Sequence, residues 1–257
     1  MQNNQERNLL IAKCIDKIRI SKTQNKITNT DFLNSYQISV VEKELFKEKS
    51  FFFYGGYEEA ERKVLVAYPN KLEKEDVLEK IDDIITAIKI ELPNEIVGKL
   101  KHKDYLGTIM SFGLTRERIG DIIVYDDKAY IVVLKENAEY IKNSINQERK
   151  FKKASVEIID INKIESKQIE FEEIKISVNS LRLDNVVAEI LKTSRKIAQD
   201  FIEQEKVIIN YIGETKNTKA IKQNDVLVIR GKGKFIIDKF LGKNKKGKEI
   251  IKIKKYK

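Results

Sequence analysis

The feature that most constrains the fold is a pair of short amphipathic patterns within residues 180–211, SLRLDNVVAEILKTSRKIAQDFIEQEKVIINY. Apolar residues recur there at helical spacing, which predicts two consecutive helices. The apolar faces are Leu183, Val186, Val187, Ile190 and Leu191 in the first helix, and Ile197, Ala198, Phe201 and Ile202 in the second. A strand-like run, DVLVIR, follows at residues 225–230. These parts predict a small module of two helices and strands.

The turn between the two predicted helices carries polar side chains with a defined use. Thr193 and Ser194 can cap the second helix, because a hydroxyl oxygen accepts hydrogen bonds from the free amides at a helix start. Arg195, Lys196 and Gln199 then project from the first turn, where the helix dipole disfavours cations. Cations in an unfavourable place indicate a function, and exposed amides together with a guanidinium form a receptor for phosphate.

Charge is distributed unevenly along the chain. The net charge is +10, but residues 1–180 hold 30 Lys and Arg against 31 Asp and Glu, whereas residues 181–257 hold 20 against 9. A basic excess confined to one folded segment is typical of a protein that binds a polyanion, and nucleic acid is the partner we expect. The balanced charge of the N-terminal part predicts that it binds RNA poorly by itself and positions the basic module.

The C-terminal pattern resembles the S4 domain, an RNA-binding module. The matching elements are Arg182-Leu183-Asp184, Ser194-Arg195-x-x-Ala198, residues 206–210 (KVIIN) and residues 224–228 (NDVLV). Because these linked elements occur in the right order, the match is specific. Glu205, Tyr211 and Asn224 stand where the S4 pattern has glycine. The resemblance and the basic charge together predict an RNA-binding surface made of Arg182, Lys192, Ser194, Arg195, Lys196, Gln199, Lys206, Asn210, Arg230, Lys232 and Lys234.

Three further blocks resemble the YlmH family of bacterial S4 proteins: residues 51–63 (FFFYGGYEEAERK), 102–122 (HKDYLGTIMSFGLTRERIGDI) and 230–235 (RGKGKF). Lys232 stands where that family has an aromatic residue. The resemblance implies a factor that binds ribosomal RNA of the large ribosomal subunit and tRNA, and that acts in the rescue of stalled nascent chains. It also implies a genetic link with cell division. The polar start MQNNQERN and the lack of a long apolar run lead us to expect a cytoplasmic protein, and the lack of cofactor motifs in residues 1–180 a non-catalytic one.

The whole chain is predicted to be α+β. We expect a helical or α+β N-terminal region at residues 1–73, a small plait-like α/β domain at 74–161, a linker or connecting strand at 162–179, and an S4 domain with a basic C-terminal hairpin at 180–257. Residues 230–257 hold 12 Lys and Arg against two acids, and the turn at 242–248 joins two strand-like runs. The hairpin is therefore expected to extend the positive face.

Other function classes find less support. A single cysteine, Cys14, on a helical apolar stripe indicates a small buried hydrophobe and a reducing compartment, and with one histidine a His/Cys metal site is excluded. The sequence has no apolar run long enough for a membrane span. It also lacks a Gly-rich loop of the kind that binds a cofactor, so neither a cofactor nor a small-molecule substrate is expected. Two alternatives stay open: an S4-tethered RNA-modifying enzyme of the pseudouridine synthase or methyltransferase type, and an adaptor in cell division.

Overall fold

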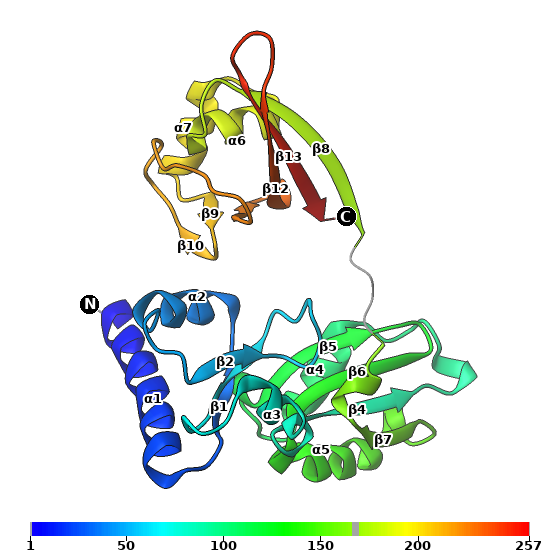
Figure 1. Cartoon of the computed structure of the whole chain (residues 1–257). Coiled ribbons are helices and arrows are strands. Elements are labelled where there is room, and N and C mark those ends of the chain that lie inside the picture. Colours follow the sequence, from blue (N-terminus) through cyan, green and yellow to red (C-terminus); the bar gives the residue numbers. More distant parts are fainter. Residues whose placement is uncertain (1, 166–169, 257) are drawn as a thin grey trace. The chain divides into compact units, whose positions relative to one another are not determined.

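The computed structural model describes residues 2–165 and 170–256, and the chain divides into two compact units, Met1–Lys167 (unit 1) and Gln168–Lys257 (unit 2) (Figure 1). In both units helices pack on antiparallel sheets, which confirms the α+β class. No described helix is both long and apolar enough to cross a bilayer.

Unit 1 contains a four-stranded sheet with two helices. Its elements are β4 (Ile85–Glu91), α4 (His102–Ser111), β5 (Ile119–Val124), β6 (Lys128–Leu134), α5 (Lys135–Gln147) and β7 (Ser155–Ile159). The strand order is β5-β6-β4-β7, and each strand runs antiparallel to its neighbours. This order of elements is that of a split βαβ fold, in agreement with the plait-like domain expected from the sequence.

A second sheet of unit 1 comes from the N-terminal region. Its elements are α1 (Gln2–Gln24), β1 (Thr28–Leu33), α2 (Ser35–Glu44), β2 (Phe51–Tyr54), β3 (Lys63–Ala67) and the short α3 (Lys74–Leu78). The order is β1-β3-β2, and α1 and α2 lie beside this sheet (Figure 1). Cys14 is buried against it, as expected, and burial raises the pKa of its thiol to about 11.

The two sheets of unit 1 share a core, so residues 1–73 do not form a separate domain. One face of the four-stranded sheet packs against α4 and α5, while the opposite face packs against the N-terminal sheet. Gly120 of β5 marks the close approach, because a Cβ there would lie 2.8 Å from the ring of Phe32 in β1. The expected boundary at residues 73 and 74 is therefore corrected: Phe32 and Val66 are buried with Ala87 and Val132 of the plait.

Unit 2 is a six-stranded sheet covered by two helices. Its elements are β8 (Phe171–Val178), α6 (Leu183–Leu191), α7 (Arg195–Glu203), β9 (Val207–Ile209), β10 (Ile212–Gly213), β11 (Val226–Ile229), β12 (Gly233–Lys243) and β13 (Glu249–Tyr256). The strand order is β10-β9-β11-β12-β13-β8, and α6 and α7 share one core with the sheet. The predicted helix pair is present, but Ile197, expected in the core, is 46% exposed.

The segment expected as a linker, residues 162–179, is only partly a connection. Residues 166–169 lie outside the described residues, whereas β8 pairs with β13 from Phe171 to Val178 and belongs to unit 2. The basic hairpin is formed by β12 and β13, and Ile251 and Ile253 of β13 are fully buried in the core of unit 2. The hairpin therefore stabilises unit 2 in addition to carrying charge.

Candidate nucleic-acid interface

The turn between α6 and α7 is fixed by its own backbone. Lys192 ends α6 in the left-handed conformation, with φ at 50°, and the Thr193 amide donates to the Ala188 carbonyl at 2.9 Å. Ser194 caps α7, because its hydroxyl accepts a hydrogen bond from the Ile197 amide at 3.3 Å. Ser194 is thus a capping residue, as its position in the sequence predicted.

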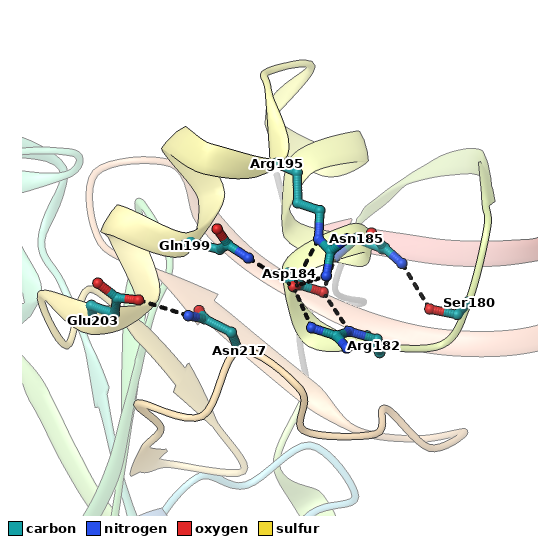
Figure 2. Close-up of polar contacts among 8 residues, drawn as sticks. All are labelled: Ser180, Arg182, Asp184, Asn185, Arg195, Gln199, Glu203 and Asn217. Carbon is teal, nitrogen blue, oxygen red and sulfur yellow. Dashed lines mark hydrogen bonds and ion pairs between the residues drawn. The ribbon is translucent and has the colours of Figure 1, made fainter.

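Asp184 organises the arginines of this turn (Figure 2). Its side chain is fully buried, and the Arg182 fork donates to both carboxylate oxygens at 3.1 and 2.9 Å. The Arg195 guanidinium donates twice to one oxygen, Oδ2, at 2.9 and 2.8 Å, and the Gln199 amide adds a bond at 3.2 Å. The arginines themselves stay near the surface, with 37% of the Arg182 and 52% of the Arg195 side chain exposed.

The electrostatics of Asp184 follow from these contacts. Burial alone would raise the pKa of its carboxyl, but hydrogen bonds from Arg182, Arg195 and Gln199 outweigh burial and lower the pKa to about 2. The carboxylate is therefore ionised at neutral pH and holds both guanidinium groups in fixed positions. This role was not predicted from the sequence, where its one signal is an acid within the apolar face of a predicted amphipathic helix.

Further exposed cations lie beside the helix turn and at the far end of α7. Lys192 and Lys196 are exposed at the turn, next to the exposed Ile197. At the other end, the Arg230 amide donates to the Lys206 carbonyl at 2.9 Å, which brings these two residues together beside the exposed Lys232. Between these two groups of cations lies α7, which has nine residues and is therefore about 14 Å long.

Two further predicted RNA-binding residues, Asn210 and Lys234, also make contacts within unit 2. The Asn210 side chain donates to Asp225 at 2.8 Å and accepts from the Val226 amide at 2.9 Å, so it joins β9 to β11. The Lys234 ammonium lies over the rings of Tyr211 and Tyr256, at 5.4 and 4.5 Å from their centres. These contacts account for both side chains without RNA.

The three positions where glycine was expected adopt the conformation that favours glycine. Glu205, Tyr211 and Asn224 have φ values of 54°, 65° and 68°. The backbone of the pattern is therefore kept even though the side chains differ, at a cost of about 1–2 kcal/mol for a non-glycine residue, less for Asn.

The blocks at residues 51–63 and 102–122 meet inside unit 1. Arg62 donates to the carbonyls of Ile119, Phe32 and Arg116 at 3.0, 3.1 and 3.2 Å, and Arg116 donates to those of Ile119 and Gly120. This arginine pair connects β1, the turn before β5, and β5 itself. The pair therefore serves the structure of unit 1. Separately, the described residues contain no cluster of His, Cys, Asp and Glu that could hold a metal.

Comparisons with known proteins agree with the resemblance seen in the sequence. Residues 79–166 match the family model described as "Putative RNA-binding domain in YlmH". The chain is 28% identical over 241 residues to the Bacillus subtilis (strain 168) protein named ribosome-associated protein quality control protein P2, covering 93% of this chain and 91% of the relative. The resemblance to YlmH-like proteins is confirmed.

A solved structure is also similar to this YlmH-like chain. It is the cell division protein YlmH from Streptococcus pneumoniae, with a TM-score of 0.48 and 17% identity, covering 62% of this chain and 95% of that chain. The family model spans the plait of unit 1 from residue 79, and does not include the helix turn of unit 2.

Proposed function

We propose that this YlmH-like protein is a non-catalytic RNA-binding factor of the ribosome. Unit 2 is an S4-type module that binds structured ribosomal RNA and tRNA on the large subunit, and the protein acts in quality control of stalled nascent chains. The name of the Bacillus subtilis relative, which is similar over nearly the whole chain, supports the ribosomal role.

The observation that carries the proposal is the arrangement around Asp184. A buried carboxylate holds two guanidinium groups half-exposed beside Lys192 and Lys196, and the turn also presents the start of α7. Fixed guanidinium groups lose little freedom when they bind phosphate, whereas free side chains must be ordered. The surface therefore suits the closely spaced phosphates of folded RNA.

The enzyme alternative has less support. The aspartate of the Arg182-Leu183-Asp184 motif could mimic the catalytic aspartate of a pseudouridine synthase, but it is fully buried and paired with two arginines. Its pKa of about 2 makes it a poor base and a poor nucleophile. A uridine-modification or methyl-transfer assay on ribosomal RNA is expected to give no product.

The test replaces Lys192 and Lys196 with Gln in the full-length protein. Substituting Arg195 would also remove a partner of Asp184, so its effect on binding would be mixed with a loss of stability. Affinity for purified large ribosomal subunits should fall about tenfold or more, and the slope of log affinity against log salt should become shallower by about 1.8.

The matched control replaces Lys71 and Lys80 of unit 1, which are also exposed, and removes the same net charge. The control should retain nearly full affinity. Equal affinity for subunits in wild type and the Lys192/Lys196 variant, with both proteins folded, would contradict the proposal.

A further inference from the structure

Unit 1 carries a cluster of cations that its balanced total charge conceals. Residues 99–103 (KLKHK) and 149–153 (RKFKK) together hold seven Lys and Arg and the single histidine of the chain, with no acid. All eight of these side chains are exposed, while Phe151 is buried. We call these two segments the basic patch.

The two segments are neighbours in space. The ring of Phe151 lies 5.7 Å from that of Tyr105 in the first turn of α4, and the Lys150 ammonium donates to the Asp104 carbonyl at 3.3 Å. Lys99 and Lys153 both contact Glu95, through its carbonyl and its carboxylate. The patch is therefore one surface, formed by the start of α4 and the turn that follows α5.

Acidic residues are concentrated elsewhere in unit 1, which explains why its positive and negative charges nearly cancel. Residues 73–83 hold six Asp and Glu against two Lys. Total charge predicts little RNA affinity for this unit, but a polyanion responds to the local field of a surface and not to the sum over the unit. The prediction from total charge is therefore weakened by the separation of the charges.

The packing of the plait restricts how it can meet RNA. Domains of the RRM type stack bases on the open face of a four-stranded sheet. In unit 1 that face is covered by the N-terminal sheet, through Phe32, Val64 and Val66. The other face is covered by α4 and α5. Neither face of this sheet is therefore open for bases to stack on, whereas the basic patch lies at the exposed start of α4, one of the two covering helices.

We infer that the basic patch is a second RNA-binding surface, which contacts the phosphate backbone of folded RNA. This inference rests on the proposed function and adds a surface to it. Six of its seven Lys and Arg residues are lysines, which bind phosphates from many directions and do not read base edges. The surface therefore adds affinity without adding sequence preference.

The test replaces Lys101, Lys103, Arg149 and Lys152 with Gln in the full-length chain. The matched control replaces four exposed lysines elsewhere in unit 1, Lys13, Lys43, Lys71 and Lys80, and so removes the same charge. Affinity of the patch variant for large ribosomal subunits should fall at least tenfold, and the salt slope should become shallower by about 3.6, against little change in the control. Resistance of the buried Cys14 to alkylation checks that both variants are folded.

The Lys192/Lys196 variant, measured in parallel, separates the two claims. If it loses affinity while the patch variant matches its control, the helix turn binds RNA and the basic patch does not. If neither variant differs from its control, the proposed function fails as well. The patch variant is also tested on phosphatidylserine vesicles and on polyglutamate. If it loses binding to either of these while its salt slope for ribosomal subunits is unchanged, the patch binds a membrane or an acidic protein, and the inference is overturned.

Discussion

Both units place an aspartate near two arginines, half-buried in unit 1 and fully buried in unit 2, but they use these residues in opposite ways. In unit 1 the aspartate is Asp121, which accepts hydrogen bonds from the Tyr57 hydroxyl at 2.9 Å and from the amides of Glu61 and Arg62 at 2.7 and 3.2 Å. The guanidinium groups of Arg62 and Arg116 donate instead to backbone carbonyls. In unit 2 both guanidinium groups donate to Asp184.

The pKa values of the two carboxyls reflect this difference. Burial raises the pKa of Asp121 and outweighs the hydrogen bonds that lower it, whereas two arginine forks lower that of Asp184. In unit 1 the guanidinium groups of the two arginines donate to backbone carbonyls, so they are not available to bind a ligand. In unit 2 they are fixed at the surface, where they can meet a ligand. An arginine therefore indicates a binding site only when its guanidinium group stays at the surface and does not donate to backbone carbonyls inside the unit.

The largest effect that tests this comparison is expected for Arg62→Met. The substitution removes one donor from each of three carbonyls, of which only that of Ile119 keeps a second guanidinium donor, from Arg116, and the free energy of unfolding of unit 1 should fall by about 4 kcal/mol. Cys14 is fully buried and its thiol has a raised pKa, so alkylation requires opening of unit 1. The rate of Cys14 alkylation should rise about a thousandfold, with no change in hydrogen exchange of unit 2.

The matched control is Arg118→Met, which removes an exposed arginine paired with Asp31 and Glu136. Surface pairs of this kind contribute about 1 kcal/mol or less, so alkylation should change less than tenfold. Equal rates in the two variants would mean that the carbonyl contacts of Arg62 do not hold the unit together, and the contrast between the units would be lost.

Local patterns were predictable from the sequence, and contacts between distant segments were not. The α6–α7 turn and its Ser194 cap follow from residues within a few positions of one another. Strand β1 was missed because its sequence, TNTDFL, is mostly polar; Thr30 is nonetheless buried, and its hydroxyl accepts from the Leu65 amide at 3.0 Å. The assignment of β8 to unit 2 depends on pairing with β13, more than 70 residues later.

The candidate site shows the same limit. The cations of the helix turn were predicted, but the pairing of Arg195 with Asp184 was not, because it joins residues on two different helices. The basic patch could be read from the letters KLKHK and RKFKK, yet only the packing of Phe151 on Tyr105 makes them one surface.

A smaller effect is expected for Asp184→Asn in unit 2. Because the folded pKa of about 2 lies below the ordinary value of 3.8, the ionised carboxylate stabilises the fold above about pH 5, and this stability is lost as the pH falls through 2. The variant should lower the free energy of unfolding by about 2 kcal/mol at pH 7 and by less than about 0.5 kcal/mol at pH 2. Urea unfolding at both pH values measures the difference.

Asp200→Asn, an exposed acid on α7, is the control for Asp184→Asn and should change stability little at either pH. A loss of stability in Asp184→Asn that is the same at pH 7 and pH 2 would indicate that the shape of the side chain matters there, and not its charge. The contrast between Asp184 and Asp121 would then have no electrostatic basis.

The smallest effect concerns backbone strain, which also differs between the units. Among the described residues, five of the six non-glycine residues with positive φ lie in unit 2, and Glu205 at 54° is an exposed one of them. Glu205→Gly should stabilise unit 2 by about 0.5–1 kcal/mol, because the relief of strain exceeds the added freedom of the unfolded chain. Glu205→Gln removes the charge but keeps the strain, so it should give no such gain.

Asn25→Gly is the counterpart in unit 1, with φ at 53°, and should gain less stability because Asn tolerates this conformation. Hydrogen exchange resolves the two units in one experiment, and an equal gain at residues 25 and 205 would show that strain is not greater in unit 2 than in unit 1.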